Sequence, residues 1–279
     1  MTLIEAINAA SAKLTAAGIP TARLDAEVLL AFVLRKDRAW LITHIHDALD
    51  DEAGRVFEAT IRRRALREPL QYVTGRQEFW GLEFTVTRDV LIPRPETECL
   101  VDIVLERMPA AEPARVLELG TGSGAIALAL AGARPDWRIT ATDISQAALE
   151  VARENARRCS ARVEFLQSDW FDAIEPGRFD LIVSNPPYVM AADGHLQLGD
   201  VRFEPRLALV GGASGMECIE TIATRARDRI RSGGWLILEH GYDQGERCLA
   251  LFHRLGYTEI DDVADLAGVA RVCAGRWQG

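Results

Sequence analysis

The sequence is poor in cysteine, and its five cysteines lie far apart: Cys99, Cys159, Cys218, Cys248 and Cys273. None of them forms a C-x-x-C pair, so the spacing predicts neither a zinc site nor a disulfide framework. We expect reduced, mostly buried thiols, as in a protein of the cytoplasm.

Long hydrophobic runs are also missing. No apolar stretch approaches the ~20 residues that a membrane-spanning helix needs, and the N-terminal segment Met1–Glu5 lacks a basic region followed by an apolar core. We therefore expect no signal peptide, no membrane partner and a cytoplasmic location. The 279 residues, of which 48% are hydrophobic, suffice for one large domain and a small one.

The sequence has no overall excess of positive charge, because its net charge is −9. Residues 1–75 contain 10 basic and 10 acidic side chains, and the other 204 residues contain 22 and 31. Nucleic-acid-binding proteins usually carry a basic surface. The local cluster Arg62–Arg64 with Arg67 is typical of a solvated helix face, so we expect no direct nucleic-acid partner.

The first 75 residues have a helical pattern. Apolar residues recur at helical spacing over 3–14, residues 24–34 form a strongly apolar run, and apolar residues stand between charged ones over 51–67. The Gly18-Ile19-Pro20 and Pro69 positions end two of these segments. We predict a small helical bundle without a chemical site of its own, whose role is to bind a partner or to pack on the larger domain.

Residues 71–98 change character. Three short segments have a β-like composition and are separated by glycines: Tyr72–Thr74, Phe79-Trp80 and Leu82–Val86. This pattern predicts a hairpin that joins two domains. Pro95 can open the helix that follows. Arg94 and Glu96 flank this stiff turn, and they could be ligand contacts or a structural ion pair.

From residue 114 onward, short apolar strands alternate with helices. Repeated strand–helix units indicate an α/β fold with a parallel sheet and helices on both of its faces. The last two predicted strands, near 257–262 and 269–274, follow each other without a helix. We expect them to form an antiparallel hairpin at the edge of the sheet.

A glycine-rich segment stands between a predicted strand and a helix: Gly120, Thr121, Gly122, Ser123 and Gly124. Glycines let the backbone approach a ligand, and a helix N-terminus offers free N–H donors. Asp143 ends the next predicted strand, 23 residues after Gly120. A carboxylate there can accept both hydroxyls of a ribose, so we expect a cofactor that contains an adenosine-like ribose.

Two further segments distinguish S-adenosylmethionine from a nicotinamide dinucleotide. Asp169 could accept a hydrogen bond from an adenine amino group, and Trp170 could cover the ring. The segment Asn185-Pro186-Pro187-Tyr188 ends another apolar strand. Its prolines prevent helix and strand pairing and form a rigid corner. An enzyme that transfers a hydride from a nicotinamide does not need such a corner, so this segment favours S-adenosylmethionine.

Together these motifs resemble a class I S-adenosylmethionine-dependent methyltransferase, and the flanking segments resemble the HemK/PrmC family of peptide chain release factor glutamine methyltransferases. The similarity covers nearly the whole chain, with a looser match at Gly268–Arg271. The segments that carry it are Arg67–Gly75, Leu91–Glu98, Phe203–Pro205, Gly233-Gly234, Leu238–Gly241 and Asp265–Gly268.

The resemblance implies a seven-stranded, mostly parallel Rossmann-like methyltransferase sheet with an antiparallel edge hairpin. It implies a helical substrate-docking domain over 1–75, a β-hairpin linker over 76–98 and a catalytic domain over 99–279. The implied substrate is the glutamine of the Gly-Gly-Gln loop of class I release factors. We expect a monomer with S-adenosylmethionine at Gly120–Gly124, Asp143, Asp169, Trp170 and Asn185.

The corner then has a chemical purpose. Asn185 Oδ1 and the Pro186 carbonyl can each accept one N–H of an amide NH2, Pro187 stiffens the backbone, and Tyr188 can pack on the amide plane. A ribosomal-protein glutamine methyltransferase would share this site, and the flanking segments favour the release-factor enzyme. A DNA adenine methyltransferase would need a basic target-recognition region. A non-catalytic nucleotide-binding module would leave the corner without a use.

Overall fold

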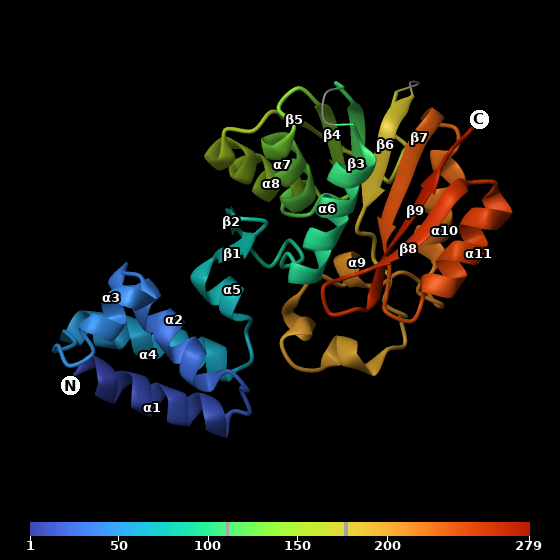
Figure 1. Cartoon of the computed structure of the whole chain (residues 1–279). Helices are drawn as coiled ribbons and strands as arrows, with labels where there is room; N and C mark the ends of the chain where they lie inside the picture. Colours follow the sequence, from blue (N-terminus) through green and yellow to red (C-terminus); the bar gives the residue numbers. More distant parts are fainter. Residues whose placement is uncertain (110–111, 176–177) are drawn as a thin grey trace. The chain divides into compact units, whose positions relative to one another are not determined.

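The computed structural model describes residues 1–109, 112–175 and 178–279. The chain divides into two compact units. One contains Met1–Arg76 together with Gln197–Phe203, and the other contains Gln77–Leu196 and Glu204–Gly279 (Figure 1). The second unit holds the sheet and all the residues of the candidate site.

The N-terminal unit is built from helices, as predicted. Thr2 begins the first helix with a capping box to Glu5, and Asp50 caps the fourth through the backbone N–H of Ala53. Buried apolar side chains of these helices form one core. The helices are α1 (Leu3–Ala16), α2 (Ala22–Leu34), α3 (Arg38–Thr43), α4 (Asp51–Ala65) and α5 (Leu70–Thr74).

A buried ion pair ties a distant segment to these helices. Arg64 is 4% exposed, and its guanidinium contacts Asp25 at 2.7 Å and Asp200 at 2.9 Å. Arg67 also contacts Asp200, at 3.1 Å. The prediction of a solvated face is therefore wrong for the buried Arg64, and Arg63 and Arg67 of the same cluster are also occupied in ion pairs. The contacts with Asp200 belong to the N-terminal unit, which includes Gln197–Phe203.

The β-like reading of Tyr72–Thr74 is wrong, because these residues lie in α5. Pro69 stands at the N-cap of this short helix, and Gly75 ends it in the left-handed conformation with φ +72°. Arg63 donates to the Tyr72 carbonyl and also pairs with Glu68. Tertiary contacts thus override the β-propensity of the segment.

The predicted hairpin begins after α5. Strands β1 (Arg76–Phe79) and β2 (Leu82–Thr85) form a two-stranded sheet around the turn Trp80-Gly81. The chain then passes through the 3-10 helix η1 (Pro95–Thr97) into α6 (Glu98–Arg107). Pro95 occupies the first position of η1, as expected for a residue that opens a helical segment.

The main sheet has seven strands in the order β5-β4-β3-β6-β7-β9-β8. The first five are parallel to one another, whereas β9 is antiparallel to both β7 and β8, which confirms the predicted edge hairpin. The strands are β3 (Arg115–Leu119), β4 (Arg138–Asp143), β5 (Val163–Gln167), β6 (Phe179–Ser184), β7 (Ile230–Glu239), β8 (Thr258–Ala264) and β9 (Ala270–Arg276).

Helices cover both faces of this sheet (Figure 1). One core includes side chains of α6 and α7, and a second core includes side chains of α10 and α11. The helices are α7 (Ala125–Ala133), α8 (Gln146–Cys159), α9 (Arg206–Leu209), α10 (Glu217–Ala226) and α11 (Gly245–Leu255), with the 3-10 helices η2 (Gly194–Gln197) and η3 (Val201–Phe203).

Among the five parallel strands, the order along the sheet reverses between β3 and β6. From β3 the chain moves to β4 and β5 on one side, and it later returns to place β6 and β7 on the other. In open α/β sheets a crevice forms at such a point, beyond the carboxyl ends of the strands. Leu119 pairs with Ser184, so the segments that follow β3 and β6 emerge side by side.

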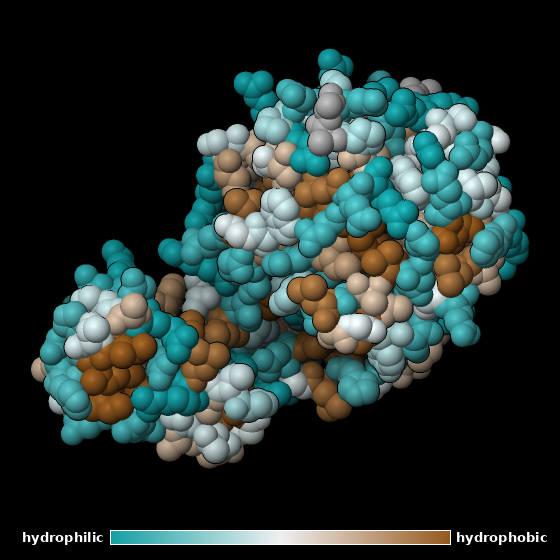
Figure 2. Space-filling model, in the orientation of Figure 1, coloured by the Kyte–Doolittle hydropathy of each residue, from teal (hydrophilic) through white to brown (hydrophobic). Residues whose placement is uncertain are grey.

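The surface mixes polar and apolar side chains. Figure 2 shows a patch of apolar side chains on the N-terminal unit, surrounded by hydrophilic ones. Across the described ranges, every helix is too short or too polar to cross a membrane.

Candidate active site

A cavity of about 280 Å³ lies at the carboxyl ends of the parallel strands. Its walls come from the segments after β3, β4, β5 and β6, together with residues before η1 and around α9. The lining residues are Asp89, Val90, Leu91, Gly120, Gly122, Asp143, Ile144, Ser145, Ala148, Ser168, Asp169, Trp170, Asn185, Pro187, Pro205, Leu207, Ala208, Val210 and Cys218. Seven of the twelve residues that the sequence singled out therefore share one cavity.

The glycine segment lines the cavity with backbone. Gly120 and Gly122 have positive φ values of +70° and +55°, which glycine adopts without strain. A Cβ on Gly122 would meet no described atom within 4 Å, and one on Gly120 would approach the Trp170 ring at 3.9 Å. A side chain at either position would thus project into or across space that a ligand can use.

The other residues of this segment contribute to the packing. Thr121 and Ser123 are buried, and the Thr121 hydroxyl donates to Glu118 Oε2 at 2.6 Å. A Cβ on Gly124 would lie 3.3 Å from the Cβ of Ala152, so this glycine lets α7 pack closely against α8.

The expectation of free N–H donors is wrong for several N–H groups of this loop and of the first turn of α7. The N–H of Gly122 donates to Asp143, that of Gly124 to the Thr121 carbonyl and that of Ala127 to Glu118. Two of these acceptors are carboxyl groups. A pyrophosphate needs such N–H groups free, so the loop suits a cofactor without phosphate.

Both carboxylate oxygens of Asp143 accept hydrogen bonds from backbone N–H groups. Its Oδ2 accepts from Gly122 N–H and its Oδ1 from Ser145 N–H, each at 2.9 Å. Burial raises the pKa of this carboxyl, and the backbone N–H groups of Ser145, Gly122 and Ile144 oppose the rise. A carboxylate has about four acceptor positions, so Asp143 keeps acceptor capacity for a ligand hydroxyl in the cavity that it lines.

Asp169 and Trp170 follow β5. Asp169 is exposed and lines the cavity, whereas Trp170 is half-buried and also packs against a hydrophobic core. Trp170 has a positive φ of 49°, and its carbonyl accepts from the Ser168 hydroxyl at 2.9 Å. This local turn places the ring beside Gly120.

The Asn185–Tyr188 corner follows β6 and is fixed through its backbone. The Tyr188 carbonyl accepts from Gln244 Nε2 at 3.0 Å, and Val189 N–H donates to the Leu209 carbonyl. Gly211 packs directly on the corner, because a Cβ there would lie 2.4 Å from the Pro187 carbonyl oxygen. The prolines are thus one part of a larger rigid frame.

Some polar groups of the corner form hydrogen bonds within the protein, and others do not. Asn185 Nδ2 donates to the Thr97 hydroxyl at 3.0 Å, and the Tyr188 hydroxyl donates to Glu239 at 3.2 Å. In the described part of the chain, neither Asn185 Oδ1 nor the buried Pro186 carbonyl accepts a hydrogen bond. The tyrosine packs against a core, and burial together with Glu239 raises its pKa. Two acceptors of the corner therefore remain unused.

Arg94 was expected to be either a ligand contact or a member of a structural ion pair. Arg94 pairs with Glu204, whose other oxygen accepts from Ile92 N–H at 3.1 Å. The pair joins Leu91–Glu98 to Phe203–Pro205, and Leu91 and Pro205 line the cavity. Arg94 is thus a structural ion-pair partner.

Sequence reasoning assigned no role to Glu118, the next-to-last residue of β3. It is 1% exposed, and burial raises its pKa to about 8. Glu118 connects the glycine segment to the start of α7 through Thr121 and Ala127. The one feature of the sequence that could have indicated a role for Glu118 is that it is the single acidic residue within an apolar strand.

Glu118 should make the stability of the protein depend on pH. The folded state holds its proton up to about pH 8, whereas the unfolded chain releases it near 4.5, so wild-type stability falls as pH rises between these values. Glu118→Gln does not titrate and keeps the acceptor oxygen. We expect its melting temperature, relative to wild type, to rise steadily from pH 5 to pH 8. A constant difference would contradict the assigned pKa.

Comparisons with known proteins agree with this geometry. The family model of the PrmC N-terminal domain matches residues 5–75, and that of the methyltransferase small domain matches residues 99–202. A solved methyltransferase from Pyrococcus furiosus has the same fold, with a TM-score of 0.56 and 19% identity over 80% of this chain and 98% of that chain.

Curated relatives are much closer in sequence. The release factor glutamine methyltransferase of Coxiella burnetii is 46% identical over 92% of both chains. That of Xylella fastidiosa (strain 9a5c) is 46% identical over 96% of this chain and 98% of the relative. With matches of this extent, the chain belongs to the release factor glutamine methyltransferase family.

Proposed function

We propose that this protein transfers a methyl group from S-adenosylmethionine to the side-chain amide nitrogen, N5, of a glutamine in a peptide chain release factor. The observation that carries the proposal is the pair of unused acceptors at the corner, Asn185 Oδ1 and the Pro186 carbonyl, beside the cavity. An amide NH2 has two N–H donors in one plane, and these acceptors match them.

The corner addresses the main difficulty of the reaction. An amide nitrogen is a poor nucleophile because its lone pair is delocalised into the carbonyl. Two rigid acceptors can hold the NH2 so that the lone pair points at the methyl carbon, and little reorganisation is then needed. Pro187 and the backbone contacts of Tyr188 supply the rigidity.

S-adenosylmethionine, when bound, supplies a methyl group on a positively charged sulfur, which is a good leaving group. The amide nitrogen forms the new N–C bond as the S–C bond breaks, and the nitrogen then carries a positive charge. Its N–H becomes strongly acidic and can lose the proton to water. The proposal therefore needs no general base.

The cavity residues suit this cofactor. Asp143 keeps acceptor capacity for a ribose hydroxyl, Trp170 and Asp169 stand where an adenine can lie, and Gly120 and Gly122 leave room for it. The loop N–H groups already bound to Asp143 and Glu118 favour this phosphate-free cofactor over a dinucleotide.

Asp143→Ala should weaken cofactor binding about tenfold to a hundredfold, because hydrogen bonds to a charged acceptor contribute roughly 1.5–3 kcal/mol. Isothermal titration calorimetry with S-adenosylmethionine measures the change. Asp136→Ala, at an exposed aspartate before β4, is the matched control and should leave the Kd unaltered. An unaltered Kd for Asp143→Ala would exclude the ribose role.

We further propose that the substrate is the glutamine of the Gly-Gly-Gln loop of class I release factors. Residues 1–75 would hold the factor, residues 76–98 would link them to the catalytic residues 99–279, and the enzyme would work as a cytoplasmic monomer without nucleic acid. The family membership and the match of residues 5–75 support this assignment.

The test is a methyl-transfer assay with radiolabelled S-adenosylmethionine. A purified class I release factor should become labelled, whereas ribosomal proteins and adenine-containing DNA should not. Labelling of ribosomal protein or DNA in place of the factor would overturn the proposal.

A further inference from the structure

Gln244 is a buried side chain that contacts the corner, and sequence reasoning gave it no role. It directly precedes α11 and is 4% exposed. Its side-chain NH2 donates to the Tyr188 carbonyl at 3.0 Å and to the Gly215 carbonyl at 3.3 Å, and its Oε1 accepts from Gly241 N–H at 2.9 Å. One buried amide therefore joins three segments, which are the corner, the loop before α10 and the turn after β7.

The orientation of this amide follows from its partners. A backbone N–H can only donate, and a carbonyl oxygen can only accept. Gly241 N–H must therefore face Oε1, and the carbonyls of Tyr188 and Gly215 must face the NH2 group. Turning the amide over would place N–H against N–H and oxygen against two carbonyl oxygens, which is costly in a buried site. Gln244 is thus held in one orientation.

Gln244 occupies the N-cap position of α11 without capping this helix. Serine, threonine, aspartate and asparagine are preferred at an N-cap, because their side chains accept from the free N–H groups of the first turn. Among the described residues of this turn, no N–H donates to the Gln244 side chain. The side-chain amide therefore does not serve the start of α11, and its two N–H groups are directed to the corner and the neighbouring loop.

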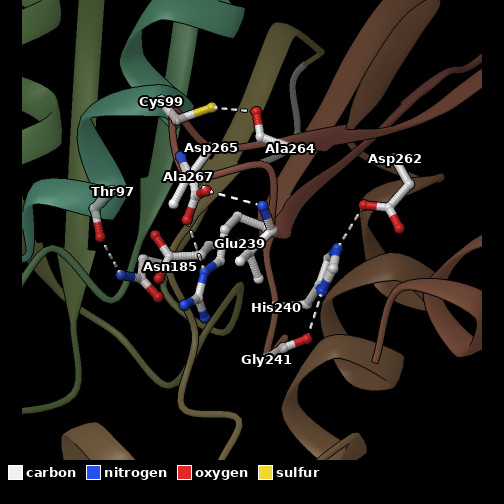
Figure 3. A network of polar contacts seen from close by, with 12 residues as sticks. Thr97, Cys99, Asn185, Glu239, His240, Gly241, Asp262, Ala264, Asp265 and Ala267 are labelled. Atoms are coloured by element: carbon white, nitrogen blue, oxygen red, sulfur yellow. Dashed lines mark hydrogen bonds and ion pairs between the residues drawn. The ribbon is translucent and has the colours of Figure 1, made fainter. Parts of the chain in front are cut away.

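The turn that carries Gln244 is itself anchored. Gln244 N–H donates to the Gly241 carbonyl at 2.9 Å. The buried His240 ring lies between the same carbonyl oxygen, 2.9 Å from Nδ1, and Asp262 Oδ1, 2.9 Å from Nε2 (Figure 3). Gly245 packs directly on Asp262, because a Cβ there would lie 2.0 Å from Oδ2. The amide therefore extends from a support that is joined to both β7 and β8.

The prolines alone do not fix the direction of the corner. A proline ring fixes φ and leaves ψ free, so the peptide group that bears the Pro186 carbonyl needs fixed points on both sides. Before the corner, the chain is held in β6 by pairing with β3 and β7. After the corner, Gln244 holds the Tyr188 carbonyl. The two fixed points together determine where the unused acceptors of the corner point.

We propose that Gln244 is a positioning residue that fixes the corner through the Tyr188 carbonyl, so that the acceptors of Asn185 and Pro186 point at the substrate amide. The inference rests on the proposed function, because it concerns the acceptors that are proposed to hold the substrate NH2. Gln244 does not belong to the described lining of the cavity. Its effect on the reaction is transmitted by the backbone of the corner.

The test is the pH profile of Gln244→Glu for methylation of a class I release factor, measured as kcat relative to wild type at each pH. The ionised carboxylate has no proton for the Tyr188 and Gly215 carbonyls and repels them. At pH 8.5 kcat should therefore be about a hundredfold low, as for a shift of the order of 1 Å at a reacting centre. The protonated carboxyl can donate one O–H, and burial favours this neutral form, so the relative kcat should rise about tenfold on going to pH 6.

Gln278→Glu, at an exposed glutamine near the C-terminus, is the matched control and should follow wild type at every pH. Calorimetry with S-adenosylmethionine provides the second readout. The Kd and the binding stoichiometry of Gln244→Glu should equal those of wild type, so the loss of kcat is not a loss of folded protein. Gln244→Met keeps the size and removes the polar atoms. Its kcat should be low without any pH dependence relative to wild type, and it decides the case if Gln244→Glu does not fold.

The outcomes separate this inference from the proposed function. A wild-type enzyme that methylates no release factor overturns the proposed function and this inference with it. With an active wild type, a normal kcat in either Gln244 variant refutes the positioning role and leaves the proposed function in place. The same holds if Gln244→Glu loses kcat equally at every pH, or loses cofactor-binding stoichiometry to the same extent as kcat.

Discussion

Asn185→Ala should lower kcat for release-factor methylation by about 10²–10³-fold, as loss of a preorganised polar group at a reacting centre does. The substitution removes the unused amide oxygen of a residue that lines the cavity and leaves the rigid backbone frame in place. The alanine side chain cannot accept the substrate N–H, so the amide would no longer be held in line with the methyl group.

The cofactor provides the control for this prediction. The ribose and adenine contacts proposed for Asp143, Asp169 and Trp170 do not involve the corner, so the Kd for S-adenosylmethionine should change little. Tyr188→Phe, which removes only the hydroxyl bound to Glu239, should reduce kcat much less. If Asn185→Ala turned over at the wild-type rate, the corner would be a purely structural loop.

Gly211→Ala should lower kcat by about 10²-fold, because it would displace the corner as a whole. A Cβ at Gly211 would stand 2.4 Å from the Pro187 carbonyl oxygen and 2.8 Å from both the Tyr188 Cα and the Gly215 carbonyl oxygen. All three are backbone atoms that cannot rotate away. A shift of the order of 1 Å at a reacting centre can reduce a rate about a hundredfold.

Gly132→Ala is the matched control for this substitution. Gly132 lies in α7, where a new Cβ would meet no described atom within 4 Å, and alanine favours the helix by up to ~1 kcal/mol. We expect full activity and an equal or higher melting temperature. Steady-state kinetics and thermal denaturation of both variants check the prediction, and an active Gly211→Ala enzyme would show that the corner tolerates displacement.

The sequence predicts those parts of the site that depend on local order along the chain. The strand–loop–helix pattern places Gly120 and Gly122 at a strand end, and Asp143 and Asn185 follow the next strands in the same way. Because the carboxyl ends of parallel strands meet at one edge, these residues come together once the sheet is predicted. All four line the cavity.

The remaining parts depend on contacts between distant segments, which no local pattern encodes. Thr97 and Asn185 are 88 residues apart, and Tyr188 and Glu239 are 51 apart. Their meeting requires the strand order and register of β6 and β7. Arg64 and Asp200 pair across the chain in the same way. The helical Tyr72–Thr74 shows the converse case, in which tertiary contacts decide against local propensity.

The most direct measurement is the site of methylation in a class I release factor after incubation with the purified enzyme and S-adenosylmethionine. Tandem mass spectrometry should find one methyl group on the side-chain nitrogen of the Gly-Gly-Gln glutamine. A factor with that glutamine replaced by alanine should stay unmodified. A methyl group at another residue, or equal labelling of the alanine variant, would contradict the account.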